Sequence, residues 1–83
     1  MCDSVQYPNI TRARFSCLQQ SANQQVGLDL TGDSGSATDS AGANTVTWNF
    51  NESTQVLTLQ VTKTPYPCWL VRPKIDQFVA SCP

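Results

Sequence analysis

Hydrophobic and polar residues alternate along residues 45–62, and this is the clearest pattern in the chain. A period of two places every second side chain on the same face of a β-strand. A polar segment at residues 51–54 interrupts the alternation and is typical of a turn. The pattern therefore predicts an antiparallel hairpin with one hydrophobic and one polar face. Its hydrophobic face would carry Val46, Trp48, Phe50, Leu57, Leu59 and Val61.

Two other segments have features of helices. Residues 10–23 are ambiguous, because hydrophobic and polar residues alternate over part of the segment, as in a strand. Their Arg, Ala, Leu and Gln content favours a helix that ends before Gly27. Asn9 is the expected N-cap of this helix. Pro73 is expected to open a second helix, because proline is favoured at the first helical position. Hydrophobic residues of the second helix repeat at helical spacing, at Ile75, Phe78, Val79 and Cys82. We expect this helix to cover the hydrophobic face of the hairpin, since a lone hairpin is only marginally stable in water.

Shorter patterns predict the rest of the chain. Residues 4–7 have the alternation of a short strand, and so do residues 26–30. Residues 31–44 contain three glycines and many small polar residues, without any large hydrophobic side chain. That composition predicts either a flexible connection or a solvated edge strand with turns at Gly35 and Gly42.

Length and charge narrow both the fold and the function. The 83 residues predict a single small domain over 1–83, with a flexible segment at 31–44. The expected fold class is α+β, an antiparallel sheet of three to five strands with two helices packed on one face. A net charge of -1 lacks the basic excess of a nucleic-acid-binding protein. No hydrophobic run approaches the roughly 18 residues of a membrane span, and residues 1–4 do not start like a signal peptide. We therefore expect no nucleic-acid partner and no membrane span.

The chain contains four cysteines, Cys2, Cys17, Cys68 and Cys82. An even number in so short a chain favours two disulfides, with three possible pairings, and a secreted or periplasmic rather than cytoplasmic location. The alternative is four reduced, buried cysteines in a cytoplasmic protein. Successive cysteines are 15, 51 and 14 residues apart and the chain has no histidine, so the spacing does not fit a zinc site and we expect no metal.

The lack of histidine also argues against an enzyme. Histidine is the usual general base near neutral pH and the partner of most Ser and Cys nucleophiles. The Gly-Asp-Ser-Gly sequence at residues 32–35 matches the nucleophile loop of trypsin-like proteases, but without a histidine it is expected to be a chance match. No carboxylate lies in a hydrophobic run that would raise its pKa, and no glycine-rich phosphate loop is present. We expect neither catalysis nor a cofactor.

The order of the predicted elements resembles that of a group of small bacterial proteins. Here a strand ending in Leu-Thr-Gly-Asp is followed by a Gly/Ser-rich segment, a Thr-rich hairpin running into Thr62-Lys63-Thr64-Pro65-Tyr66, and a final helix around Ile75. In that group the corresponding strand runs into Thr-Lys-Lys-Pro-Phe and the last helix begins near an Ile-Glu pair, where this chain has Ile75-Asp76. The likeness spans about residues 4–80. It implies a similar fold and no particular function, since the group has no assigned activity.

Three hypotheses for function follow. The first is a non-enzymatic binding or protein-interaction domain, with Tyr66 and Trp69 as contact residues because Tyr and Trp dominate interaction hot spots; in the alternative, Trp69 is packed under the last helix. The second is a carrier for a small apolar ligand, in a pocket between helices and sheet. That pocket would be lined by Trp48, Phe50, Leu59 and Phe78. The third is a cystatin-like protease inhibitor, based on Gln25-Val26-Gly27 and Pro67-Cys68-Trp69.

Overall fold

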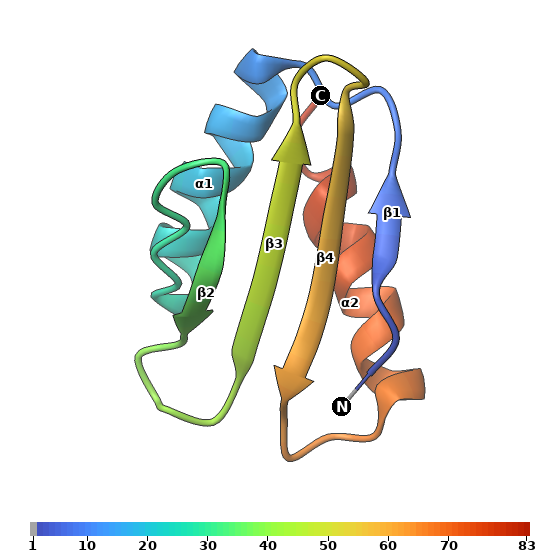
Figure 1. Ribbon diagram of the computed structural model, residues 1–83. Helices are drawn as coiled ribbons and strands as arrows, with labels where there is room; N and C mark the ends of the chain where they lie inside the picture. The colour runs from blue at the N-terminus through green and yellow to red at the C-terminus, as the bar shows by residue number, and fades with distance from the viewer. Residues whose placement is uncertain (1) are drawn as a thin grey trace.

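The hairpin predicted for residues 45–62 forms the centre of an antiparallel sheet in the computed structural model, which describes residues 2–83 (Figure 1). The sheet has four strands in the order β1-β4-β3-β2, and both helices lie on the same face of it. This arrangement confirms the predicted α+β fold class. The elements are β1 (Val5–Tyr7), α1 (Arg12–Val26), β2 (Ser34–Thr38), β3 (Thr45–Asn51), β4 (Val56–Lys63) and α2 (Cys68–Ala80).

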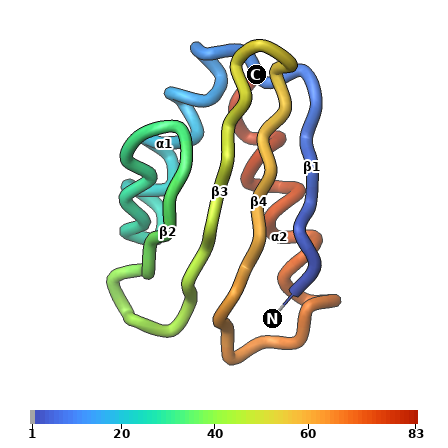
Figure 2. Tube along the Cα trace, in the orientation of Figure 1, coloured from blue at the N-terminus to red at the C-terminus, as the bar shows by residue number. Residues whose placement is uncertain are grey.

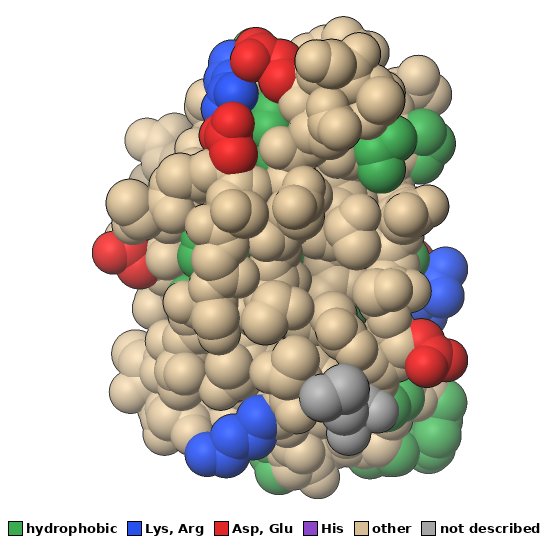
Figure 3. Space-filling model, viewed as in Figure 1, with side chains coloured by type: hydrophobic (Ala, Val, Ile, Leu, Met, Phe, Trp, Pro, Cys, Tyr) green, Lys and Arg blue, Asp and Glu red, His purple; other side chains and the backbone are tan. Residues whose placement is uncertain are grey.

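The register of the hairpin puts the expected side chains together on one face. Trp48 pairs with Leu59 and Phe50 with Leu57, so these four residues meet across the β3–β4 pair, and all of them are buried. Because neighbouring residues of a strand point to opposite faces, the threonines of both strands lie on the solvent side. Figure 3 shows that uncharged polar side chains and backbone cover most of this solvent face, while charged and hydrophobic side chains are seen at its periphery.

Helix α1 covers the region predicted to be helical, but its cap differs from the prediction. Thr11, not Asn9, is the N-cap, and its hydroxyl accepts a hydrogen bond of 3.1 Å from the backbone N–H of Arg14. Asn9 lies outside the helix with a positive φ of 61°. The helix ends as expected at Gly27, whose φ of 70° is left-handed and allows its N–H to bond the carbonyl of Asn23.

The strand predicted for residues 26–30 is wrong. Val26 is the last residue of α1, and residues 27–33 have no regular structure, although Leu30 is buried in the core. The alternating residues span the end of a helix and the loop that follows it. The hydrophobic pattern alone does not distinguish this arrangement from a strand. The edge strand is β2 instead, within the Gly/Ser-rich segment, and it pairs with β3. Gly35 lies inside this strand, opposite Trp48, rather than in a turn.

Helix α2 begins at Cys68, five residues before the predicted start at Pro73. Pro67 is its N-cap, and the carbonyl of Pro67 accepts hydrogen bonds from the N–H groups of Leu70 and Val71. Pro73 is therefore inside the helix and removes one intrahelical donor. The hydrophobic stripe was predicted correctly, because Val79 and Cys82 are buried and Ile75 and Phe78 pack against the core.

Two disulfides are present: Cys2–Cys68 joins the N-terminal segment to the first residue of α2, and Cys17–Cys82 joins α1 to the C-terminal segment. They confirm the predicted pairing of all four cysteines into two bridges. The first fixes the start of α2 beside the N-terminal segment, and the second ties α1 to the end of α2. Structural disulfides form and persist in oxidising environments, so the folded chain is suited to such an environment. None of the helices in residues 2–83 has the length and hydrophobicity required to cross a bilayer.

Candidate functional site

A hydrophobic groove lies between the two helices, on the face of the sheet that they cover. Its volume is about 420 Å³. Strands β3 and β4 supply its floor, α1 and the residues just after it supply one wall, and α2 supplies the other. The hydrophobic lining residues are Val46, Leu59 and Val61 on the floor, Ala22, Val26 and Leu28 on the first wall, and Val71, Ile75 and Phe78 on the second, with Tyr66 joining them from the β4–α2 loop.

The shape of the helix pair explains the groove. The helices lie close together near the C-terminus, and they splay apart towards the end of the molecule where α1 ends and α2 begins (Figures 1 and 2). The Cys17–Cys82 disulfide links them at the closed end. Short side chains, such as those of Ala22 and Val26 on α1, do not fill the space that opens beyond it.

Two of the four residues predicted to line a pocket do so, and two do not. Leu59 and Phe78 line the groove. Trp48 and Phe50 lie outside it and fill the core beside α1 instead. The Phe50 ring stacks on the ring of Phe15, with 4.4 Å between centroids, and the indole N–H of Trp48 donates to the carbonyl of Gly32 at 3.2 Å. The prediction failed for these two because the hairpin alternation gives the face of a residue, but not which helix lies over it.

The two predicted contact residues are both exposed. Tyr66 is 58% exposed and lines the open end of the groove, and Trp69 is 72% exposed in the first turn of α2. Leu70, beside it, is 38% exposed. The alternative that Trp69 packs under the last helix is wrong, because α2 begins at Cys68 and turns this side chain away from the core.

Among residues 2–83, two charged side chains line the groove, Asp39 and Lys74. The Asp39 carboxylate accepts hydrogen bonds from the Asn44 side chain at 2.7 Å and from the backbone N–H groups of Ala43 and Asn44. These bonds, above all the one from the Asn44 side chain, lower the pKa of Asp39. Lys74, on α2, has no ion pair with any of residues 2–83.

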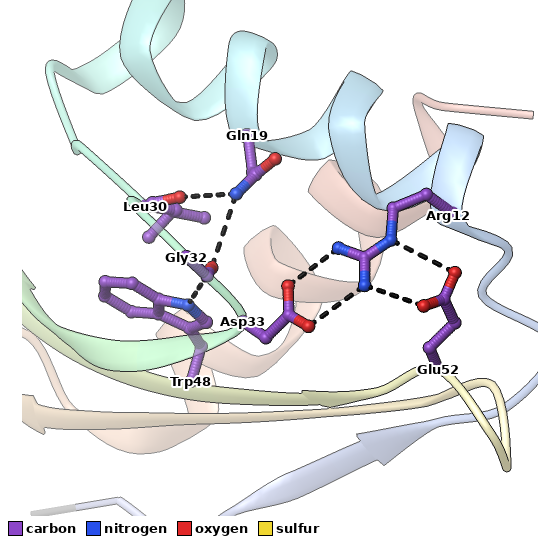
Figure 4. Close-up of polar contacts among 7 residues, drawn as sticks. All are labelled: Arg12, Gln19, Leu30, Gly32, Asp33, Trp48 and Glu52. Atoms are coloured by element: carbon purple, nitrogen blue, oxygen red, sulfur yellow. Dashed lines mark hydrogen bonds and ion pairs between the residues drawn. The ribbon is translucent and has the colours of Figure 1, made fainter.

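An arginine clamp, formed by Arg12 with Asp33 and Glu52, was not predicted from the sequence (Figure 4). Arg12 bonds both carboxylate oxygens of Asp33, at 2.7 and 2.9 Å, and Glu52 at 3.0 Å. Its guanidinium also lies 5.0 Å from the centre of the Phe50 ring. Asp33 belongs to the Gly-Asp-Ser-Gly sequence, so this short motif has a structural role here: it fixes the loop before β2 to the start of α1. No spacing rule links these three positions, since they are far apart in the sequence.

Hydrogen bonds lower the pKa values of four carboxyl groups, those of Asp33, Asp39, Glu52 and Asp76. Hydrogen bonds from Arg12 lower the pKa values of Asp33 and Glu52, and a hydrogen bond from Tyr7 lowers that of Asp76. Burial, together with the same bond to Asp76, raises the pKa of Tyr7. A general acid needs a carboxyl pKa shifted in the opposite direction, towards neutrality. Residues 2–83 also contain no group of three or more potential metal ligands.

The segments behind the cystatin-like hypothesis are both at helix ends. Gln25 and Val26 form the last turn of α1, with Gly27 as its C-cap, and Pro67 to Trp69 begin α2.

Comparison of the chain with protein-family models, curated proteins and solved structures gave no match. The resemblance to small bacterial proteins therefore stays a prediction.

Proposed function

We propose that this chain is a non-enzymatic binding domain that holds a small apolar ligand in the groove between α1 and α2, in a secreted or periplasmic setting. The observation that carries the proposal is the groove itself. A volume of about 420 Å³ falls within the range of roughly 300–1,000 Å³ that is typical of ligand sites. The two disulfides support the compartment.

The lining explains why a ligand would bind. Val46, Val71, Ile75 and Phe78 are only partly buried, so the folded chain leaves hydrophobic surface of its interior in contact with water. Each CH₂ group that a ligand buries against this surface contributes about 0.8 kcal/mol before the cost of association. The disulfide at the closed end holds the walls in place before binding, which reduces that cost.

Binding of an uncharged apolar probe tests the proposal. N-phenyl-1-naphthylamine is expected to bind saturably, with one molecule per chain, and to gain fluorescence as it leaves water. Val71→Phe places a larger side chain on the α2 wall and is expected to weaken probe binding at least tenfold. Val56→Phe is the matched control, because Val56 is partly buried in β4 but does not line the groove.

The outcomes are separable. Shifts in amide NMR signals on probe addition should be largest around Leu59, Ile75 and Phe78, and this mapping needs no variant. Absence of saturable binding to the native protein would overturn the proposal. An equal loss of affinity in the Val56→Phe and Val71→Phe variants, or signal shifts confined to the solvent face of the sheet, would overturn it as well.

A second candidate function is protein interaction through the exposed residues Tyr66, Trp69 and Leu70. The observation that favours it is the exposure of a large, rigid hydrophobic surface beside the Cys2–Cys68 bridge, since aromatic anchors of this kind dominate interfaces. A partner that uses this surface should lose affinity for Trp69→Ala and keep it for Val71→Phe, as measured by calorimetry. The reverse pattern would place that partner in the groove.

A further inference from the structure

The charges around the groove are not equivalent. A ligand in the groove meets one negative and one positive side chain, Asp39 and Lys74. The carboxylate of Asp39 is already bonded by Asn44 and by the backbone of the β2–β3 turn. Lys74 forms no ion pair within residues 2–83, so its ammonium group is available to a ligand.

The other basic side chains are occupied elsewhere. Arg12 is held by Asp33 and Glu52, and Arg72 by Asp76 at 3.3 Å. Arg14 donates to the backbone carbonyl of Cys82 at 2.9 Å. Lys63 lies at the open end of the molecule, but it contacts the carbonyl of Gly42 at 3.5 Å and does not line the groove. Within the described residues, Lys74 is thus the only basic side chain of the groove.

The dimensions of the α2 wall indicate the shape of the ligand. The lining residues of this wall run from Val71 on α2 to its C-cap Ser81, which is about 15 Å along the helix axis at 1.5 Å per residue. An extended alkyl chain advances roughly 1.3 Å per carbon, given bonds of about 1.5 Å at tetrahedral angles. The wall therefore has the length of a chain of about twelve carbons. Helical side chains incline towards the helix N-terminus, so Lys74 inclines towards the open end.

We propose that the natural ligand is an amphiphile with an alkyl chain and a carboxylate head, the chemistry of a fatty acid. The chain would lie on Leu59, Ile75 and Phe78, and the carboxylate would pair with Lys74 near the open end. This inference rests on the proposed function, and it adds the chemical class of the ligand. The ammonium group of Lys74, which has no ion pair within residues 2–83, is complementary to such a head group, whereas the oxygens of the Asp39 carboxylate already accept hydrogen bonds from Ala43 and Asn44.

Displacement of bound N-phenyl-1-naphthylamine by dodecanoate, dodecan-1-ol and dodecylamine tests the inference. Lys74→Gln is expected to weaken dodecanoate binding about three- to fivefold, the value of an exposed ion pair, and to change dodecan-1-ol binding less than twofold. Lys74→Glu should improve the binding of dodecylamine by a similar factor. The matched control is Lys63→Gln, which removes the same charge from the same end of the molecule and should leave all three affinities within twofold.

Each failure has a different meaning. If the probe binds but dodecanoate and dodecan-1-ol respond equally to Lys74→Gln, the inference about the head group is overturned and the groove remains a binding site. Equal effects of Lys63→Gln and Lys74→Gln would also overturn it, since only the net charge would then matter. If neither the probe nor any of the three amphiphiles binds the native protein, the proposed function itself fails.

Discussion

Removal of one disulfide should cost a large and calculable part of the stability. The Cys17–Cys82 bridge joins residues 65 positions apart, and a cross-link over a loop of that length stabilises a chain by about 4.3 kcal/mol in the chain-entropy account. In the native chain, however, the second bridge provides a shorter path. It runs 15 residues from Cys17 back to Cys2, across to Cys68, and 14 residues on to Cys82. For this loop of about 30 residues the expected loss is about 3.6 kcal/mol.

The same path applies to the other bridge, so both pairwise variants, Cys2→Ala/Cys68→Ala and Cys17→Ala/Cys82→Ala, should be destabilised by similar amounts. The second bridge to be removed should cost about 0.7 kcal/mol more than the first, because the short path no longer exists. The sum, about 8 kcal/mol, lies in the middle of the roughly 4–12 kcal/mol expected for 83 residues. At a native stability of this size, each pairwise variant should fold, whereas the variant without cysteines should have an unfolding free energy near zero and be about half unfolded.

Guanidinium denaturation, followed by the fluorescence of the buried Trp48, measures these differences. The dependence of the unfolding free energy on denaturant should also become steeper, since the unfolded chain is less constrained. A loss below about 1 kcal/mol in both pairwise variants, or a variant without cysteines that is as stable as either of them, would refute the loop argument.

Three further predictions concern single residues. Gly27→Ala should cost about 2–3 kcal/mol in a guanidinium titration, because Gly27 has a left-handed φ and a Cβ atom there would lie 2.8 Å from the side chain of Ser40. Gly32 is also left-handed but has open space around it, so Gly32→Ala should cost only about 1 kcal/mol in the same titration. The carboxylates of the arginine clamp have lowered pKa values in the folded state, so they stabilise the protein above their unfolded pKa values, and this stability is lost as the pH falls below about 4. Arg12→Gln should therefore make the unfolding midpoint less sensitive to pH between 2 and 5. An unchanged dependence of the midpoint on pH would contradict the assignment. The pKa of Tyr7 is raised, so its contribution is complete below its unfolded pKa and is lost as the pH rises above about 10; Tyr7→Phe should remove that alkaline loss in thermal melts between pH 8 and 11.

The fold was predictable wherever a periodic hydrophobic pattern defined one buried face of a strand or helix. The alternation of residues 45–62 gave the hairpin and its buried face, and the helical spacing of Ile75 and Phe78 gave the orientation of α2. Prediction failed where local signals compete. Pro73 suggests a helix start by its type alone, whereas Pro67 and the neighbouring Cys68 decide the actual start through the N-cap and the disulfide.

The groove was only partly predictable for a different reason. Its residues come from both helices, from strands β3 and β4, and from the loops that follow α1, β2 and β4, and its volume depends on how far the helices diverge. Leu59 and Phe78 could be proposed because each lies on a hydrophobic stripe. Ala22 and Lys74 line the groove because of the way the two helices are oriented. Nothing in the sequence distinguishes these two positions from those of any other small residue or surface lysine. The same holds for the arginine clamp, which joins Arg12 to residues 21 and 40 positions away.

The placement of the two tryptophans gives the protein a pair of built-in optical reporters. Trp48 is 5% exposed and Trp69 is 72% exposed. In the folded chain, acrylamide should quench emission from Trp69 first, while the blue-shifted emission of Trp48 persists until the chain unfolds. Collisional quenching can thus follow the exposed surface at the start of α2 and the integrity of the core in one unlabelled sample, with each signal assigned by a single Trp→Phe replacement.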